Sequence, residues 1–334
     1  MNVRRQSRRQ QPGGRRQQPQ LISGIALAAT TALGLAALTG CSSDSAAATG
    51  KDGKLDVVAS FYPMAFLAEQ IGGTHVSVES LTEPGQEPHD LEISAKQTAR
   101  LEKADAIVYL KNLQPSVDAA VKQSSVKTKV DAASLTSLEK HGNEVGGHAA
   151  EADHTKNDEL AGLDPHIWLD PVRYSQVAQG VGEALEKADP AHAADYKKNT
   201  AALVTKLTAL DTQFKTGLAN TKTKVFITTH AAFGYLAERY GLTEEAINGL
   251  DPESEPSAAR VKDLEKMAKA DGVTTVFYET LVSDKTAKTI ASDANLKTDV
   301  LDPIEGITDK SRGKDYFSVQ EANLKALQTA LGTK

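Results

Sequence analysis

Short apolar runs alternate with longer segments of helical period from Leu55 to the end of the chain. Short runs rich in β-branched residues are typical of buried strands, and their alternation with helices is typical of parallel sheets. The pattern predicts strands over 55–60, 76–81, 106–110 and 127–131 in the first half, and over 224–229, 245–248, 273–278 and 298–301 in the second.

The segments between these strands carry the helical pattern. They predict helices over 64–71, 95–103, 115–122, 231–240, 256–270, 285–293 and 319–331. The second half therefore repeats the alternation of the first, although no residue-level repeat accompanies it. We expect an α/β protein with two similar (β/α) lobes, each built on a parallel sheet.

A longer helical pattern separates the two halves. Asp170 and Asp189 each precede a proline, and an acid followed by proline is typical of an N-cap and first helical position. After the second acid an apolar stripe follows at helical spacing, formed by Tyr196, Leu203, Leu207, Leu210 and Phe214. A helix unbroken from 190 to 218 would be about 40 Å long at ~1.5 Å per residue. We therefore expect a long rigid helix that joins the lobes.

The amino-terminal segment has the pattern of an export signal. Six arginines precede an apolar, small-residue stretch over 21–38, and Cys41, the only cysteine, closes the run Leu-Thr-Gly-Cys where a lipoprotein signal is cleaved and acylated. We predict an extracytoplasmic protein anchored to the cell membrane through lipidated Cys41. The alternative is one transmembrane helix before a soluble domain. The absence of a stop-transfer flank disfavours that alternative.

These features predict the domain organisation. The signal peptide covers 1–40, a small polar tether covers 41–54, and the N-terminal lobe covers 55–188, with a mobile polar loop over 139–163. The connecting helix covers 189–218, and the C-terminal lobe covers 219–334.

Charge and cysteine content narrow the function. Without the six arginines of the leader, 32 basic residues face 44 acidic ones, and the formal charge is −12 rather than −6. A nucleic acid partner is therefore not expected. A single cysteine allows no internal disulfide and no thiolate metal site, so a metal would be held by nitrogen and oxygen atoms.

Candidate ligands follow predicted strands. His230 directly follows one strand, Asp302 follows another, and His89 lies in a loop after a third. The carboxyl ends of parallel strands meet at one edge of a sheet, where open α/β proteins bind ligands. His166 lies in LDPHIWLDP, which enters the first interlobe helix. Each histidine alone is more often a surface or capping residue, but the set indicates a shared site.

Four motifs resemble a known family. PGQEPHDLEIS, DPHIWLDP, TTHAAFGYLAERYGL and the late LDP resemble, in order and spacing, the metal-site motifs of ZnuA/TroA-like solute-binding lipoproteins of metal-uptake ABC transporters. The resemblance implies two (β/α) lobes, a long connecting helix and a metal site in the cleft. It also implies the ligands His89, His166, His230 and Asp302. The chain departs from the family pattern after His89, where an aromatic residue and a proline are usual.

Glu279, also at a strand end, is the alternative carboxylate ligand, or else an acceptor behind the ligands or a helix cap. Imidazole suits zinc, whereas manganese favours more oxygen ligands, so three histidines and one carboxylate favour Zn(II) over Mn(II). The manganese members that this chain resembles tend to place an acid where His230 stands.

Three further histidines, His141, His148 and His154, lie in the polar segment 139–163. Zinc-type members of the family carry a histidine-rich loop at this place. These histidines are either chance residues of a solvated loop or weak auxiliary metal ligands, and the sequence favours neither interpretation.

The function that follows is capture of Zn(II) and delivery to the membrane permease of an ABC transporter, by a protein that we expect to be a monomer. The alternatives are the same fold binding Mn(II) or Fe(II), a metal-binding surface adhesin, and a zinc hydrolase. The chain has neither an HExxH nor a GxSxG motif, and a fourth protein ligand would close the site to a catalytic water. We therefore expect no enzymatic activity.

Overall fold

Two four-stranded parallel sheets form the frame of the protein. The computed structural model describes residues 53–141 and 162–333, so the export signal, Cys41, His148 and His154 lie outside the described residues. The first sheet has the order β2-β1-β3-β4, and the second has the equivalent order β6-β5-β7-β8. The predicted fold class, two α/β lobes with parallel sheets, is confirmed.

The strands fall close to their predicted positions. The first sheet contains β1 (Leu55–Ala59), β2 (Val76–Ser80), β3 (Ala106–Tyr109) and β4 (Thr128–Asp131). The second contains β5 (Val225–Thr228), β6 (Thr243–Ala246), β7 (Thr275–Tyr278) and β8 (Lys297–Val300). Strand β6 begins at Thr243 rather than at the predicted Glu245. The buried carboxylate of Glu244 is compatible with a strand because it is hydrogen-bonded to Thr228 and to the backbone N–H of Phe233.

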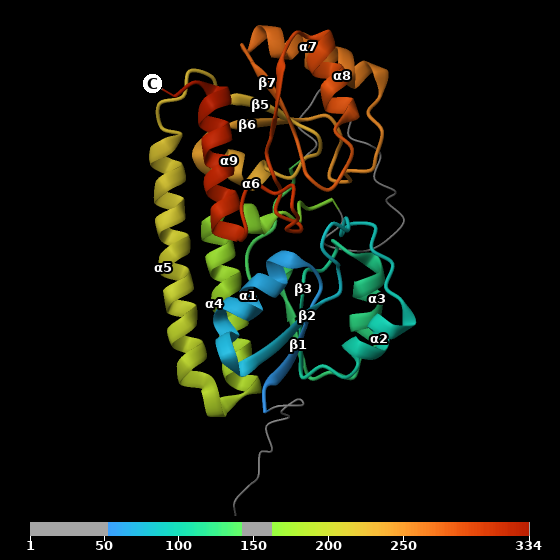
Figure 1. Ribbon diagram of the computed structural model, residues 1–334, viewed down its shortest axis with the longest axis vertical. Helices are drawn as coiled ribbons and strands as arrows, with labels where there is room; N and C mark the ends of the chain where they lie inside the picture. Colours follow the sequence, from blue (N-terminus) through green and yellow to red (C-terminus); the bar gives the residue numbers. More distant parts are fainter. Residues whose placement is uncertain (1–52, 142–161, 334) are drawn as a thin grey trace, which may run out of the picture. The chain divides into compact units, whose positions relative to one another are not determined.

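Helices cover both faces of each sheet (Figure 1). The first lobe carries α1 (Tyr62–Gly72), α2 (Ala95–Leu101) and α3 (Pro115–Gln123); the second carries α6 (Gly234–Tyr240), α7 (Ala258–Ala270), α8 (Lys285–Asp293) and α9 (Tyr316–Leu331). Val57 and Val58, adjacent on β1, are both fully buried and belong to different apolar clusters. A parallel sheet buried on both faces accounts for the continuous apolar runs in the sequence.

Two long helices join the lobes. Helix α4 (Pro171–Ala188) begins at Asp170, whose side chain accepts from the backbone N–H groups of Val172 and Arg173, as predicted for an N-cap. The expected cap at Asp189 is wrong. Its carboxylate instead accepts from His192 and Tyr196, and a 3₁₀ turn (Pro190–His192) precedes α5.

Helix α5 (Ala193–Gly217) buries the whole predicted apolar stripe from Tyr196 to Phe214. It packs against α1 and α4 of the first lobe and against α9 of the second (Figure 1). Gly182 permits the close approach of α4 and α5, because a Cβ there would lie 2.3 Å from Oγ1 of Thr200.

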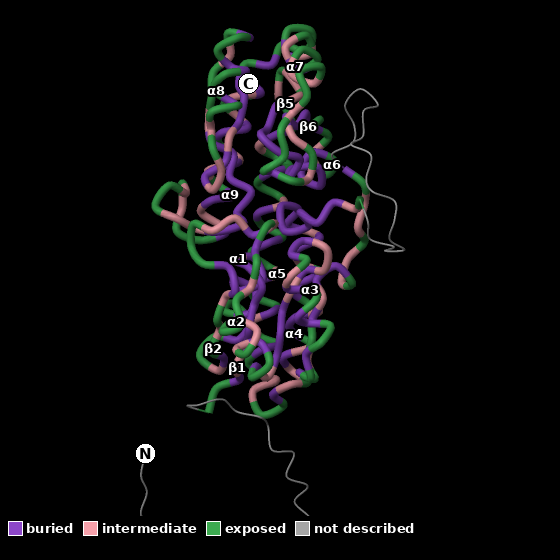
Figure 2. Tube along the Cα trace, turned by 90° about the vertical axis from the view of Figure 1, so that its right-hand side faces the viewer, coloured by how far each residue is buried: buried purple, intermediate pink, exposed green. Residues whose placement is uncertain are grey.

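The largest apolar cluster extends through both lobes. It includes Val57 of β1, Leu207 of α5 and Phe226 of β5. Figure 2 shows buried residues in the interior and exposed residues at the outer turns, and the edge strands β2 and β8 are only partly buried. Among the described helices, none is long and apolar enough to cross a membrane.

Candidate metal centre

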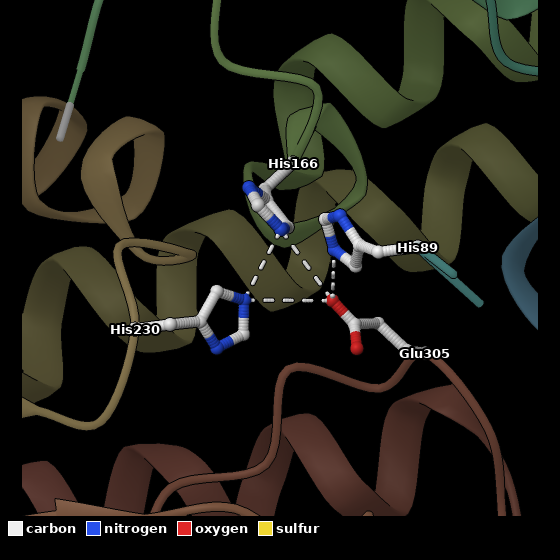
Figure 3. A group of neighbouring side chains, drawn as sticks. All are labelled: His89, His166, His230 and Glu305. Atoms are coloured by element: carbon white, nitrogen blue, oxygen red, sulfur yellow. Dashed lines mark hydrogen bonds and ion pairs between the residues drawn. The ribbon is translucent and has the colours of Figure 1, made fainter. Parts of the chain in front are cut away.

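Three histidines and one glutamate from four separate segments meet between the lobes (Figure 3). His89 lies in the loop after β2, and His166 directly precedes the 3₁₀ turn Ile167–Leu169 that leads into α4. His230 follows β5, and Glu305 follows β8. Figure 3 shows the three rings and the carboxylate directed toward one another.

The spacing of the four ligand atoms suits one metal ion. Glu305 Oε1 lies 3.2 Å from His89 Nε2, 3.4 Å from His166 Nε2 and 3.7 Å from His230 Nε2. The Nε2 atoms of His166 and His230 are 3.3 Å apart. Tetrahedral zinc with bonds of roughly 2.0–2.2 Å separates its ligand atoms by about 3.3–3.6 Å. The donor set therefore fits zinc in both chemistry and spacing.

Carboxylates orient two of the histidine rings. His166 Nδ1 lies 2.7 Å from Oδ1 of Asp164, and His230 Nδ1 lies 2.8 Å from Oε1 of Glu279. Donation from each Nδ1 leaves the Nε2 lone pair directed into the group. Glu279 thus lies behind His230 and outside the group of four. It also accepts from Thr229 Oγ1 at 2.6 Å.

Burial is unequal among the four side chains. His166 and Glu305 are fully enclosed, His230 is 1% exposed, and the His89 side chain is 12% exposed. Beyond His89, Leu91 packs into the core and Ser94 forms a capping box with Gln97 at the start of α2. The residues at which the chain departs from the family pattern therefore anchor the His89 loop.

The pKa values of these side chains are shifted by one another and by Asp164 and Glu279. Burial alone would raise the pKa of Glu305, but hydrogen bonds from His166, His230 and His89 hold it well below its usual range. Burial would lower the pKa of His230, yet Glu279 and Glu305 raise it well above 6.5. The pKa of His166 is raised in the same way by Asp164 and Glu305, against the effect of burial. These shifts favour the ionised form of Glu305 and the protonated forms of His166 and His230, and a metal ion must displace any proton bound at Nε2.

The structure differs from the expectation at the fourth position, where Glu305 stands instead of Asp302. One oxygen of Asp302 accepts from the backbone N–H of Ile304 at 2.8 Å, and the other accepts from Thr280 Oγ1 at 3.2 Å. These bonds shape the turn that follows β8 and carry the chain on to Glu305. The sequence contains both acids in LDPIEG, and the prediction took the one nearest the strand.

A hydrogen bond across the lobes holds this turn beside His166. Trp168 Nε1 donates to the backbone carbonyl of Pro303 at 2.6 Å, and Tyr316 Oη donates to the carbonyl of Trp168 at 2.6 Å. The segment with His166 and the turn with Glu305 are therefore fixed to each other. Neither Asp164 nor Trp168 was predicted to contribute to the site.

His141 was expected in a solvated loop, and the structure differs. Its side chain is 9% exposed, its Nδ1 lies 2.9 Å from Oδ2 of Asp164, and its ring packs edge-on against Tyr235. Partners supplied by distant segments, which a local polarity pattern cannot indicate, account for this burial. His148 and His154 lie outside the described residues.

Known proteins resemble the chain over nearly all of its described length. A family model described as ZnuA, zinc-uptake complex component A periplasmic, matches residues 57–330. The zinc-binding lipoprotein AdcA of Streptococcus pneumoniae serotype 4 is 38% identical over 285 residues, which cover 83% of this chain and 56% of that protein. The high-affinity zinc uptake system protein ZnuA of Bacillus subtilis is 35% identical over 306 residues, which cover 90% of this chain and 95% of that protein.

The fold is also similar to solved structures. The crystal structure of the Zn(II)-bound ZnuA-like domain of Streptococcus pneumoniae AdcA superposes with a TM-score of 0.70 at 36% identity, and covers 84% of this chain and 99% of that one. The chain therefore spans about half the length of full AdcA and nearly the whole of its ZnuA-like domain.

Proposed function

Since this chain belongs to the ZnuA family of zinc-uptake components, we propose that it captures Zn(II) outside the cytoplasm and delivers it to an ABC-type uptake permease. The observation that carries the proposal is the convergence of three imidazole Nε2 atoms and one carboxylate oxygen between the lobes. In this proposal the ligands are His89, His166, His230 and Glu305, and Asp302 shapes the turn.

The donor set supports a transport site for zinc. Three imidazoles and one carboxylate favour Zn(II) over Mn(II), which prefers a larger share of oxygen. Four protein ligands complete a tetrahedral shell, whereas a catalytic zinc keeps one position for water. The site is therefore built for holding and releasing an ion rather than for hydrolysis.

Attachment to the membrane is the second part of the proposal. Acylation at Cys41 would hold the protein at the outer surface of the cell membrane, with 41–54 as the predicted tether between the lipid and a monomeric body that delivers its ion to the permease. Replacing Cys41 with Ala should abolish labelling by a fatty acid in cells. Persistent labelling of the variant would contradict the lipoprotein assignment.

Competitive zinc titration tests the ligand assignment. Glu305→Gln removes the only charged ligand and should weaken zinc binding by roughly 100-fold or more. Loss of a ligand should cost more affinity than loss of a residue that only orients a ligand, which costs roughly 10–100-fold. Asp302→Asn should cost less, since an amide oxygen can still accept from the N–H of Ile304. Glu279→Gln should weaken zinc binding by an intermediate factor, roughly 10–100-fold, because it alters a residue that orients His230.

Glu321→Gln, an exposed change of equal charge on α9, is the matched control and should leave zinc affinity unchanged. If Asp302→Asn weakened binding as much as Glu305→Gln did, Asp302 would return as the fourth ligand. If none of the three variants weakened binding, the site itself would be misassigned.

A further inference from the structure

The ring of His89 is held differently from the rings of the other two histidines. His166 and His230 each direct Nδ1 at a buried carboxylate, at 2.7 Å and 2.8 Å. Among the described residues, none forms a hydrogen bond with Nδ1 of His89, whose Nε2 faces Glu305. The His89 side chain is also the most exposed of the four, at 12%. Its direction therefore depends on how its backbone is held.

The carboxylate of Glu87 holds that backbone. Its Oε1 accepts from the backbone N–H of His89 at 3.1 Å, and its Oε2 accepts from the backbone N–H of Asp90 at 3.2 Å. Pro88, which lies between them, has a fixed φ and no N–H of its own. One side chain therefore closes the turn from which the His89 ring projects.

Other contacts fix both ends of this turn. Before it, Gly85 adopts φ 85°, a conformation that glycine takes without strain. After it, Leu91 is buried in the core, and its carbonyl oxygen accepts from Ser116 Oγ. The ends of the loop are thus held without Glu87. The conformation of the turn between them is what depends on Glu87.

We propose that Glu87 is the positioning residue for His89 and thereby sets the rate at which the bound ion leaves the site. This role rests on the proposed function, in which His89 is a zinc ligand. To turn away from the ion, His166 and His230 must each break a hydrogen bond to a buried carboxylate. His89 has no such bond to break, so it is the ligand that detaches first.

Glu87 acts on the backbone of His89 rather than on the ion. It does not belong to the group of four side chains whose ligand atoms meet. Each of its oxygens already accepts a backbone N–H, and a metal ion would have to take the place of one of these donors. Removal of Glu87 should therefore affect zinc only through the position of His89.

Stopped-flow capture by an excess of a chromophoric chelator measures the rate at which zinc leaves the loaded protein. Glu87→Ala removes both acceptors and should raise this rate roughly 10-fold or more, the range that loss of a supporting residue costs a metal site. Glu87→Asp should stay within about 3-fold of the wild type, because an aspartate side chain can accept from the N–H two residues further on. Glu83→Ala, an equal loss of charge at an exposed position of the same loop, is the matched control and should leave the rate unchanged.

A double-mutant cycle shows whether Glu87 acts through His89. In a His89→Ala background, which keeps three ligands, Glu87→Ala should change the release rate by no more than about 2-fold, because no ring is left to position. Combined with Glu279→Gln, which affects His230 instead, Glu87→Ala should multiply the rate by its full factor.

The outcomes separate the two proposals. Equal release rates for the wild type and Glu87→Ala would overturn the role of Glu87 and leave the ligand set intact. A full effect of Glu87→Ala that persists in the His89→Ala background would make Glu87 a ligand and would also overturn the positioning role. If His89→Ala itself left zinc affinity unchanged, the proposed ligand set would fail, and the role of Glu87 with it.

Discussion

At the scale of single residues, Thr228 has one hydroxyl proton and two acceptors. Its Oγ1 lies 2.9 Å from the carbonyl oxygen of His230 and 2.7 Å from Oε1 of Glu244. One proton cannot serve both. Burial raises the pKa of Glu244 to about 7, and a protonated Glu244 can donate to Thr228 while its other oxygen accepts from Phe233 N–H. A neutral Glu244 therefore satisfies the loop that carries His230.

Glu244→Gln should stabilise the metal-free protein at alkaline pH. A carboxyl whose pKa is raised in the folded protein resists ionisation there. Wild-type stability should therefore fall as pH rises from about 4.5, the ordinary pKa of a glutamate, to about 7, the pKa of Glu244 in the folded protein. Glutamine keeps both hydrogen bonds and removes this dependence. We expect little difference in Tm at pH 5 and a gain of roughly 2–6 °C at pH 8, since one pKa unit is about 1.4 kcal/mol. A difference in Tm that does not vary with pH would contradict a neutral Glu244.

The residue scale is also where prediction from sequence stops. His89, His166 and His230 could be found because they follow strands or enter the interlobe helix. Glu305 could not, because its position depends on a turn in which Ile304 adopts φ 59°, a left-handed conformation that isoleucine rarely takes. Glu279 was predicted as an alternative ligand, an acceptor behind the ligands or a helix cap, and its contact with His230 Nδ1 fits the second of these. Asp164 was not predicted to support the site, because a carboxylate beside a histidine in a loop gives no signal of its own in the sequence.

At the scale of elements, hydrophobic periodicity predicted which segments form helices and strands, but it did not predict all of their ends. The apolar stripe of α5 predicted its buried face, because the residues at helical spacing from Tyr196 to Phe214 are those that pack against the core. The helix itself is shorter than the predicted 190–218. Strand β6 was predicted over 245–248 and lies over Thr243–Ala246, because Glu244 is compatible with a buried strand only through hydrogen-bond partners that the sequence does not indicate. The proline after Asp189 correctly indicated a helical start, but the first turn is 3₁₀.

The contact between α4 and α5 should tolerate no added methyl group at Gly182. In Gly182→Ala the new Cβ would meet Thr200 Oγ1, which lies 2.3 Å from its ideal position. Overpacking costs about 1–3 kcal/mol. It should outweigh the roughly 1 kcal/mol by which alanine favours a helix over glycine. Chemical denaturation should therefore show a loss of stability.

Adding Thr200→Ala to Gly182→Ala should restore most of that loss, because it removes the colliding atom. Gly249→Ala is the control, since a Cβ there would meet no atom within 4 Å. A Gly182→Ala protein as stable as the wild type would show that the two helices separate without cost.

At the scale of the whole molecule, the metal-free protein and its zinc complex should respond oppositely to pH. The raised pKa values of His166 and His230 contribute stability that is complete below about 6.5 and is lost as pH rises through their folded values. The lowered pKa of Glu305 contributes stability that is complete above about 4.5 and is lost in acid. The metal-free protein should therefore be most stable between these limits.

Zinc must displace the same protons, so its stabilising effect should increase from pH 5.5 to pH 8. At about 1,000 times its dissociation constant, zinc should add roughly 4 kcal/mol. The measurement is thermal unfolding with and without zinc across this pH range. It is made in the Glu244→Gln variant, in which the titration of Glu244 no longer contributes. A zinc-induced shift in Tm that stays constant with pH would argue against protonated histidines in the metal-free site.

The two-lobe architecture could be predicted because each strand and helix has its own local hydrophobic pattern. The apolar cluster that passes through both lobes could not be predicted, because the residues that join it depend on which helix packs against which sheet. Leu207 was predicted in the connecting helix and Phe226 in the second lobe, and both belong to one core that also contains Val57 of the first lobe.

Two of the four proposed ligands come from each lobe, His89 and His166 from the first and His230 and Glu305 from the second. An ion held in this way is a cross-link between the two lobes, as a bond between chains is in a polymer network. The loaded protein would resist a pulling force between its lobes more strongly than the empty one, even if their outlines were identical.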